Sequence, residues 1–182
     1  EGDRGYIVTF ERIDPLFTLD LSDPRDPKIM GELEVTGFSN YLHPIGDDHL
    51  LAVGEEVSVD GFSWEGLQVS LFDISDFSDP LLADRSVVPG MGWSEAQYNH
   101  HAFTWYEPYK VLSIPVQRWF DGDDWPDSAL AMFEVDVDAA DPLVPLAEID
   151  HGAWLYEMGG RELWEDAQWC NQVRRTIFMD DV

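Results

Sequence analysis

Three histidines and one glutamate are candidate ligands of a transition metal in this sequence. They are His43, Glu95, His100 and His101. Imidazole nitrogen and carboxylate oxygen are common ligands of zinc and related metals, so these residues predict a site of that kind. The alternative is structural, with each histidine hydrogen-bonded to a backbone carbonyl. Adjacent residues of a strand point to opposite faces, which separates His100 from His101 unless the strand bulges.

Four aspartates in the acidic stretch 121–127 form a second candidate metal site. They are Asp121, Asp123, Asp124 and Asp127. Calcium takes about six to eight oxygen ligands and suits closely spaced carboxylates, so the stretch predicts a calcium site. It does not follow the EF-hand pattern, because Pro126 interrupts it and the downstream glutamate of that pattern is missing. A solvated acidic loop without a bound ion is the alternative.

The charge of the chain limits the classes of partner that it can bind. Its 37 acidic residues face 10 basic ones, for a formal net charge of -27. Such a surface repels phosphate backbones and anionic lipid headgroups, so neither nucleic acid nor a membrane surface is an expected partner. No apolar run approaches the length of about 18 residues that a membrane span needs. Divalent cations and basic proteins fit this charge better.

A β-hairpin repeated along the chain must position these residues. An alternating apolar strand runs into an Asp-rich turn closed by Asp-Pro in residues 19–27 (LDLSDPRDP), 72–80 (FDISDFSDP) and, more loosely, 133–142 (FEVDVDAADP). A second apolar strand leaves each turn. Asp and Ser at such turns hydrogen-bond their own backbone, and Pro fixes φ. A hairpin that recurs at intervals of roughly 50 to 60 residues indicates an all-β repeat fold.

The repeat extends beyond the hairpin to a whole antiparallel unit of four strands. Residues 98–105 take the place of residues 41–45 as the first strand of such a unit. The predicted organisation is a single segment, 1–182, with a partial unit at 5–36, complete units at 41–88 and 98–150, and the start of another at 151–182. Such units predict a β-propeller fragment, with about three four-stranded blades in an incomplete ring. Neighbouring chains or missing blades are expected to cover the open blade edges.

Several motifs of the chain are those of a known family. They occupy residues 14–24 (DPLFTLDLSDP), 31–33 (GEL), 37–44 (GFSNYLHP), 71–76 (LFDISD) and 94–103 (SEAQYNHHAF). Together they resemble the β-propeller domain family of secreted bacterial and archaeal proteins, which is distantly related to WD-repeat propellers. The resemblance spans residues 5–182. It implies an extracellular or cell-surface location and more blades than this chain holds, and it brings no reaction, substrate or catalytic residue with it.

The sequence favours a binding or scaffold module over an enzyme. It contains no Gly-x-Ser-x-Gly nucleophile motif. The first strand of each blade lines the channel of a propeller, so His43, His100 and His101 would meet there, with Glu95 beside them. A metal-dependent hydrolase or oxidoreductase at the channel is therefore the alternative function. The main prediction is a secreted or cell-surface module, stabilised by calcium, that binds a protein or carbohydrate ligand.

Overall fold

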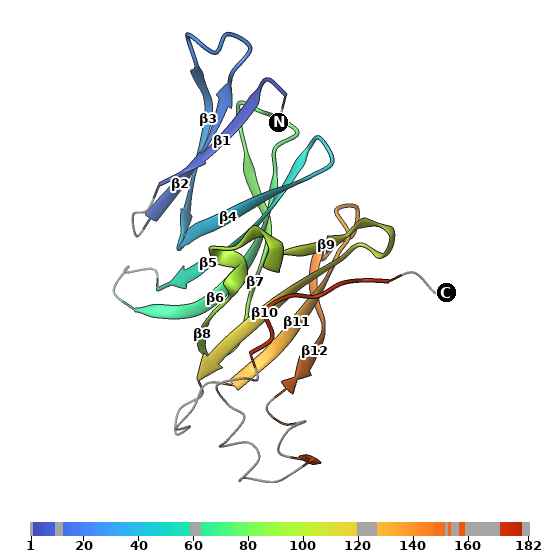
Figure 1. Ribbon diagram of the computed structural model, residues 1–182. Coiled ribbons are helices and arrows are strands. Elements are labelled where there is room, and N and C mark those ends of the chain that lie inside the picture. Colours follow the sequence, from blue (N-terminus) through green and yellow to red (C-terminus); the bar gives the residue numbers. More distant parts are fainter. Residues whose placement is uncertain are drawn as a thin grey trace. The chain divides into compact units, whose positions relative to one another are not determined.

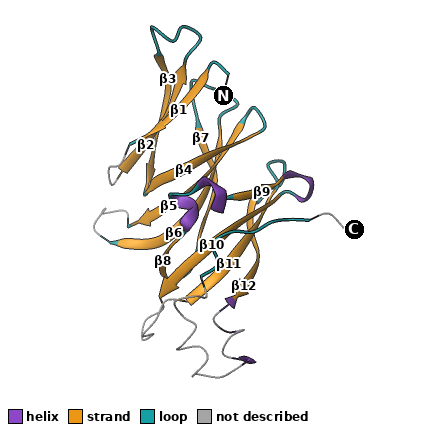
Figure 2. Ribbon diagram, in the orientation of Figure 1, coloured by secondary structure: helices purple, strands orange, loops and turns teal. Residues whose placement is uncertain are grey.

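The structure, a computed structural model, consists of antiparallel β-sheet in two compact units (Figures 1 and 2). Unit 1 comprises Glu1–Val88 and unit 2 comprises Pro89–Val182, and each is described by itself. The structure describes residues 2–9, 13–58, 63–119, 127–151, 153, 157–158 and 172–179. In that part of the chain, no helix has the length and hydropathy that a membrane crossing requires.

Unit 1 begins with a three-stranded sheet, sheet A. Strand β1 (Arg4–Val8) pairs with β2 (Ile13–Asp20), which pairs with β3 (Lys28–Thr36), and both pairings are antiparallel. The register sets Tyr6 opposite Thr18, and Ile7 opposite Phe17. Because side chains alternate along a strand, the first pair lies on one face of sheet A and the second pair on the other.

A four-stranded sheet, sheet B, completes unit 1. Its strands lie in chain order and are β4 (Phe38–Ile45), β5 (His49–Val57), β6 (Trp64–Asp73) and β7 (Leu81–Val87). Residues 50–53 of β5 and 66–72 of β6 are all buried. Burial of consecutive residues means that both faces of the central strands are covered, since neighbouring side chains point to opposite faces.

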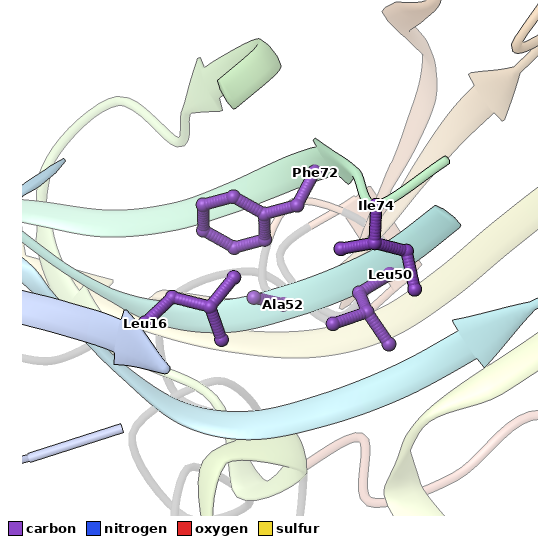
Figure 3. Packing of buried hydrophobic residues seen from close by; sticks show 5 residues of the cluster. All are labelled: Leu16, Leu50, Ala52, Phe72 and Ile74. Carbon is purple, nitrogen blue, oxygen red and sulfur yellow. The ribbon is translucent and has the colours of Figure 1, made fainter. Parts of the chain in front are cut away.

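One face of sheet B packs on sheet A through a small apolar core. Leu16 of β2 contacts a cluster from sheet B, and Figure 3 shows its side chain pointing toward Phe72 and Ala52. The other members of the cluster are Leu50 and Ile74, and all five residues are at most 1% exposed. Burying an apolar side chain of this size stabilises a fold by about 1.5–3 kcal/mol. The two sheets are therefore joined face to face by side chains from the repeated strands.

The Asp-rich turns of the repeat form hydrogen bonds with their own backbone, as the sequence predicts. In the β2–β3 turn the Asp20 carboxylate accepts a hydrogen bond from the Ser22 amide at 2.9 Å. In the β6–β7 turn Asp73 accepts from the Ser75 amide at the same distance of 2.9 Å. These bonds fix the shape of the turns without help from other elements, because donor and acceptor are two residues apart.

Unit 2 contains a five-stranded sheet, sheet C, built around one long strand, β10 (Val111–Trp119). On one side β10 pairs with β11 (Asp127–Val135), which pairs with β12 (Leu143–Asp150). On its other side it pairs with two short strands, β8 (Met91–Trp93) at one end and β9 (Thr104–Tyr106) at the other. The predicted all-β fold of antiparallel sheets is confirmed, although the first strand of sheet C is interrupted.

Two 3₁₀ turns, Glu95–Gln97 and His100–Ala102, lie between β8 and β9, and the second occupies part of the stretch 98–105 that was predicted to be a first strand. Ser94 begins the first turn, and its side chain accepts a hydrogen bond from the Ala96 amide at 3.1 Å. Asn99 begins the second turn in the same way, by accepting from the His101 amide at 3.1 Å. Side chains that cap a turn compete with strand pairing, which explains why pairing with β10 stops after β8 and resumes only at residues 104–106.

Candidate functional site

A cavity of about 620 Å³ lies at the end of unit 1 where its hairpin turns gather. The residues that line it include three aspartates, Asp3, Asp47 and Asp48, together with Arg4 and Tyr6. This space is here called the turn pocket. Carboxylates beside an aromatic ring are groups that attract a cation.

The backbone around the turn pocket is fixed by hydrogen bonds between sequence-distant segments. The Ile74 amide donates to the Asp48 carbonyl at 2.8 Å, and the Leu21 amide donates to the Asp3 carbonyl at 2.7 Å. Gly46, which precedes the two aspartates, has a φ of 57°, a left-handed conformation that glycine adopts without steric cost. The acidic wall is therefore held by rigid turns of both sheets.

Arg4 forms part of the wall and is held by neighbouring groups. Its guanidinium donates to the Asp47 carbonyl at 3.0 Å and lies 5.0 Å from the centre of the Phe77 ring. The Tyr6 ring meets the same Phe77 ring edge-on, with centroids 5.9 Å apart. These contacts bring β1, the β4–β5 turn and the β6–β7 turn together at the pocket.

Two further aspartates adjoin residues that line the turn pocket, since Asp20 pairs with Arg4 across sheet A and Asp73 immediately precedes Ile74. Hydrogen bonds from Ser22 lower the pKa of Asp20, and hydrogen bonds from Ser75 lower the pKa of Asp73. A carboxyl with a lowered pKa stays ionised at mildly acidic pH. Asp20 and Asp73 therefore keep their negative charge at mildly acidic pH.

The four residues predicted to bind a transition metal are divided between the two units. His43 lies on β4 in unit 1, where its Nδ1 atom is 3.3 Å from the Tyr41 hydroxyl. Glu95, His100 and His101 lie in the 3₁₀ turns of unit 2. Within either unit, the described residues include no group of three or more His, Cys, Asp or Glu side chains placed to hold a metal ion.

The 3₁₀ geometry changes the relation between the two adjacent histidines. Both His100 and His101 are exposed, and their rings lie 4.0 Å apart. The expectation that they point to opposite faces does not apply, because a strand alternates its side chains and a 3₁₀ turn does not. Glu95 accepts a hydrogen bond from the Asn99 amide group at 2.8 Å, which holds its carboxylate within the turn.

Of the predicted calcium ligands, Asp121, Asp123 and Asp124 lie outside the described residues. Asp127 begins β11, and its carboxylate lies 3.3 Å from the guanidinium of Arg118. That guanidinium also donates to Glu148 on β12 at 2.7 Å. Burial raises the pKa of Asp127, the nearby Asp150 carboxylate raises it further, and Arg118 opposes both. Two neighbouring carboxylates therefore stand beside the predicted loop.

Unit 1 contains an ion pair, between a buried glutamate and an exposed arginine, that the sequence did not predict. Glu56 on β5 is only 6% exposed and lies 2.8 Å from the guanidinium of Arg85 on β7. Arg85 also donates to the Thr36 hydroxyl at the end of β3 at 2.8 Å, so the group connects sheet B to sheet A. Burial raises the pKa of Glu56, and Arg85 opposes that shift. The sequence offers no signal for this pairing, because the residues meet only when the sheets pack.

Comparison with known proteins assigns the chain to one family. Residues 1–182 match the family model described as the beta propeller domain. An uncharacterised protein of Methanocaldococcus jannaschii is 42% identical over 115 residues, which are 63% of this chain and 17% of that protein. An uncharacterised protein of Archaeoglobus fulgidus is 45% identical over 117 residues, 64% of this chain and 17% of that protein. The match thus covers a small part of the length of each relative.

Proposed function

Because the chain belongs to the β-propeller domain family, we propose that it is a binding module whose turn pocket receives a lysine or arginine side chain of a protein ligand. β-Propeller domains commonly act as binding or scaffold modules. The observation that carries the proposal is the lining of the turn pocket, a space of about 620 Å³ to which Asp3, Asp47 and Asp48 all contribute. That volume falls in the range of about 300–1,000 Å³ found for ligand pockets.

Charge favours a basic ligand over the other classes. The net charge of -27 attracts cations over a distance and raises the rate at which a basic protein meets the surface. Tyr6 in the pocket wall offers an aromatic ring, which binds a cation through its negatively charged face. A secreted or cell-surface location fits a module of this kind and remains part of the proposal.

The test is a titration of the protein with a short lysine- and arginine-rich peptide, followed by calorimetry at low salt. We expect the double variant Asp47→Asn and Asp48→Asn to weaken binding by up to about thirtyfold, since each exposed charge pair contributes up to about 1 kcal/mol. The matched control is Asp138→Asn with Asp141→Asn, which removes the same charge from a turn of unit 2. Equal loss of affinity in both double variants would show that the peptide senses overall charge and not the pocket.

Calcium stabilisation is a second, independent part of the proposal. The observation that favours it is the pair Asp127 and Asp150, whose mutual repulsion a bound cation would relieve. We expect added calcium to raise the melting temperature, a chelator to lower it again, and Asp150→Asn to reduce the difference. A melting temperature that is the same with calcium and with chelator would mean that calcium does not stabilise the fold.

A further inference from the structure

The turn pocket contains a cation that the chain itself supplies. Arg4 of β1 lines the pocket together with Asp3, Asp47 and Asp48. Its guanidinium donates a hydrogen bond to the Asp47 carbonyl at 3.0 Å and lies over the Phe77 ring, 5.0 Å from the ring centre. A pocket that is proposed to receive a basic side chain is therefore already in contact with an arginine of its own chain.

The Phe77 ring is held in place by groups other than Arg4. It meets the Tyr6 ring edge-on, with centroids 5.9 Å apart and ring planes at 82°. The Phe77 carbonyl accepts a hydrogen bond from the Thr18 hydroxyl at 2.6 Å, which fixes the β6–β7 turn against β2. The ring is therefore expected to keep its position when Arg4 is replaced.

The Asp47 carbonyl is likewise positioned by the backbone of its own turn. Gly46 precedes it with a φ of 57°, and the next carbonyl, that of Asp48, accepts a hydrogen bond from the Ile74 amide at 2.8 Å. These features fix the β4–β5 turn on both sides of Asp47. The Asp47 carbonyl and the Phe77 ring are here called the arginine subsite, because together they hold the guanidinium of Arg4.

The arginine subsite suits a guanidinium better than an ammonium group. A guanidinium is planar, so it can donate a hydrogen bond in its plane while its face lies over an aromatic ring. An ammonium group is a compact, strongly hydrated charge that has no flat face to place on the ring. A lysine of a ligand would therefore depend mainly on the aspartates of the pocket, whereas an arginine would gain most from the subsite that Arg4 fills.

A ligand can compete with Arg4 for the arginine subsite. Arg4 is exposed, and the contacts of an exposed cation are weak. Two guanidinium groups side by side repel each other, so an arginine of the ligand must either displace Arg4 or bind outside the subsite. Both routes lower the affinity of the pocket for arginine.

We propose that Arg4 determines the specificity of the turn pocket: because it fills the arginine subsite, it disfavours arginine in a ligand relative to lysine. This inference rests on the proposed function and narrows it, since lysine becomes the preferred basic group of the protein ligand. Removal of the planar group at position 4 should open the subsite and shift the preference toward arginine.

The test compares two peptides of equal length and charge, one with lysine and the other with arginine at every basic position. Calorimetry at low salt gives the ratio of their dissociation constants, in which the effect of overall charge cancels. We expect this ratio to shift toward arginine by about fivefold in Arg4→Gln, and in the same direction in Arg4→Lys, which keeps the charge but loses the planar group. Arg175→Gln, which removes an exposed arginine from unit 2, should leave the ratio unchanged.

A double variant checks whether the ligand uses the Phe77 ring. Phe77→Leu combined with Arg4→Gln should abolish the gain in affinity for the arginine peptide, because the ring is then missing from the subsite. Circular dichroism shows whether the double variant is folded, and Arg4→Gln alone changes only an exposed side chain. A gain that persists without the ring would contradict the arginine subsite.

The outcomes separate the role of Arg4 from the proposed function. An unchanged ratio in Arg4→Gln, with binding that still depends on Asp47 and Asp48, would overturn the role of Arg4 alone. A shift toward lysine would overturn it as well, because Arg4 would then support the binding of arginine. If neither peptide loses affinity in the variant carrying Asp47→Asn and Asp48→Asn, the pocket is not the binding site, and both proposals are wrong.

Discussion

Single residues at the junction of sheets A and B carry electrostatic roles that the sequence does not reveal. Glu56 is buried beside Arg85 and shares it with Thr36. Burial of the Glu56 carboxylate costs desolvation energy, which its attraction to the exposed Arg85 offsets only in part. By contrast, the role of the turn aspartates could be predicted from the sequence. Asp20 and Asp73 each accept a hydrogen bond from the backbone amide of the residue two positions later, which is a local interaction.

The raised pKa of Glu56 predicts a distinct pH dependence. Its folded pKa lies above the ordinary value of 4.5, so the folded state holds the proton more tightly than the unfolded chain does. This contribution to the free energy of unfolding is fully present below about pH 4.5 and is lost as pH rises through the folded pKa. Glu56→Gln should remove it. Urea unfolding at several pH values should show the wild type losing stability relative to Glu56→Gln as pH rises above that range.

The exposed residue Glu32 on β3 supplies the control for this measurement. Glu32→Gln removes the same charge from the same unit without entering the junction. If the wild type instead gains stability over Glu56→Gln with rising pH, the attraction to Arg85 outweighs the effect of burial. The pKa of Glu56 would then be lowered in the folded state and not raised.

At the scale of elements, the hairpin repeat was readable from the sequence and the interrupted strand was not. Apolar alternation and Asp-Pro turns predict β2–β3 and β6–β7, because both signals are local. In sheet C the residues between β8 and β9 form 3₁₀ turns capped by Ser94 and Asn99. Each of these caps is a local signal for a turn, but alignment with the preceding repeat favoured a strand over the same residues. The turn pocket could not be predicted, because β1 and the β4–β5 turn meet only in the folded unit.

Close packing of β3 on the β6–β7 turn makes Gly31 sensitive to substitution. A Cβ atom there would lie 2.7 Å from Pro80 and 2.9 Å from the backbone of Ser78. We expect Gly31→Ala to destabilise unit 1 by about 1–3 kcal/mol, as overpacking typically does, because backbone cannot move aside as a flexible side chain can. The measurement is the midpoint of urea unfolding. Glu34→Ala on the same strand is the control, and an equal midpoint for both variants would contradict the contact.

The whole molecule carries a charge that opposes its own folding. With a net charge of -27, acidic groups repel one another in the compact state, and salt screens that repulsion. The melting temperature should therefore rise when sodium chloride is increased from about 0.01 M to about 0.5 M, over which the screening length falls from about 30 Å to under 10 Å. A melting temperature that falls with salt would mean that attractive ion pairs such as Arg118 with Glu148 dominate instead.

The turn pocket can be tested most directly by mapping the binding of a single cationic group. An NMR titration of the ¹⁵N-labelled protein with arginine amide reports which backbone amides sense the ligand. We expect shift changes concentrated at residues 2–6 and 46–48, and their loss in the variant carrying Asp47→Asn and Asp48→Asn. Shifts spread evenly over acidic turns of both units, or unchanged in that variant, would contradict a cation-binding pocket in unit 1.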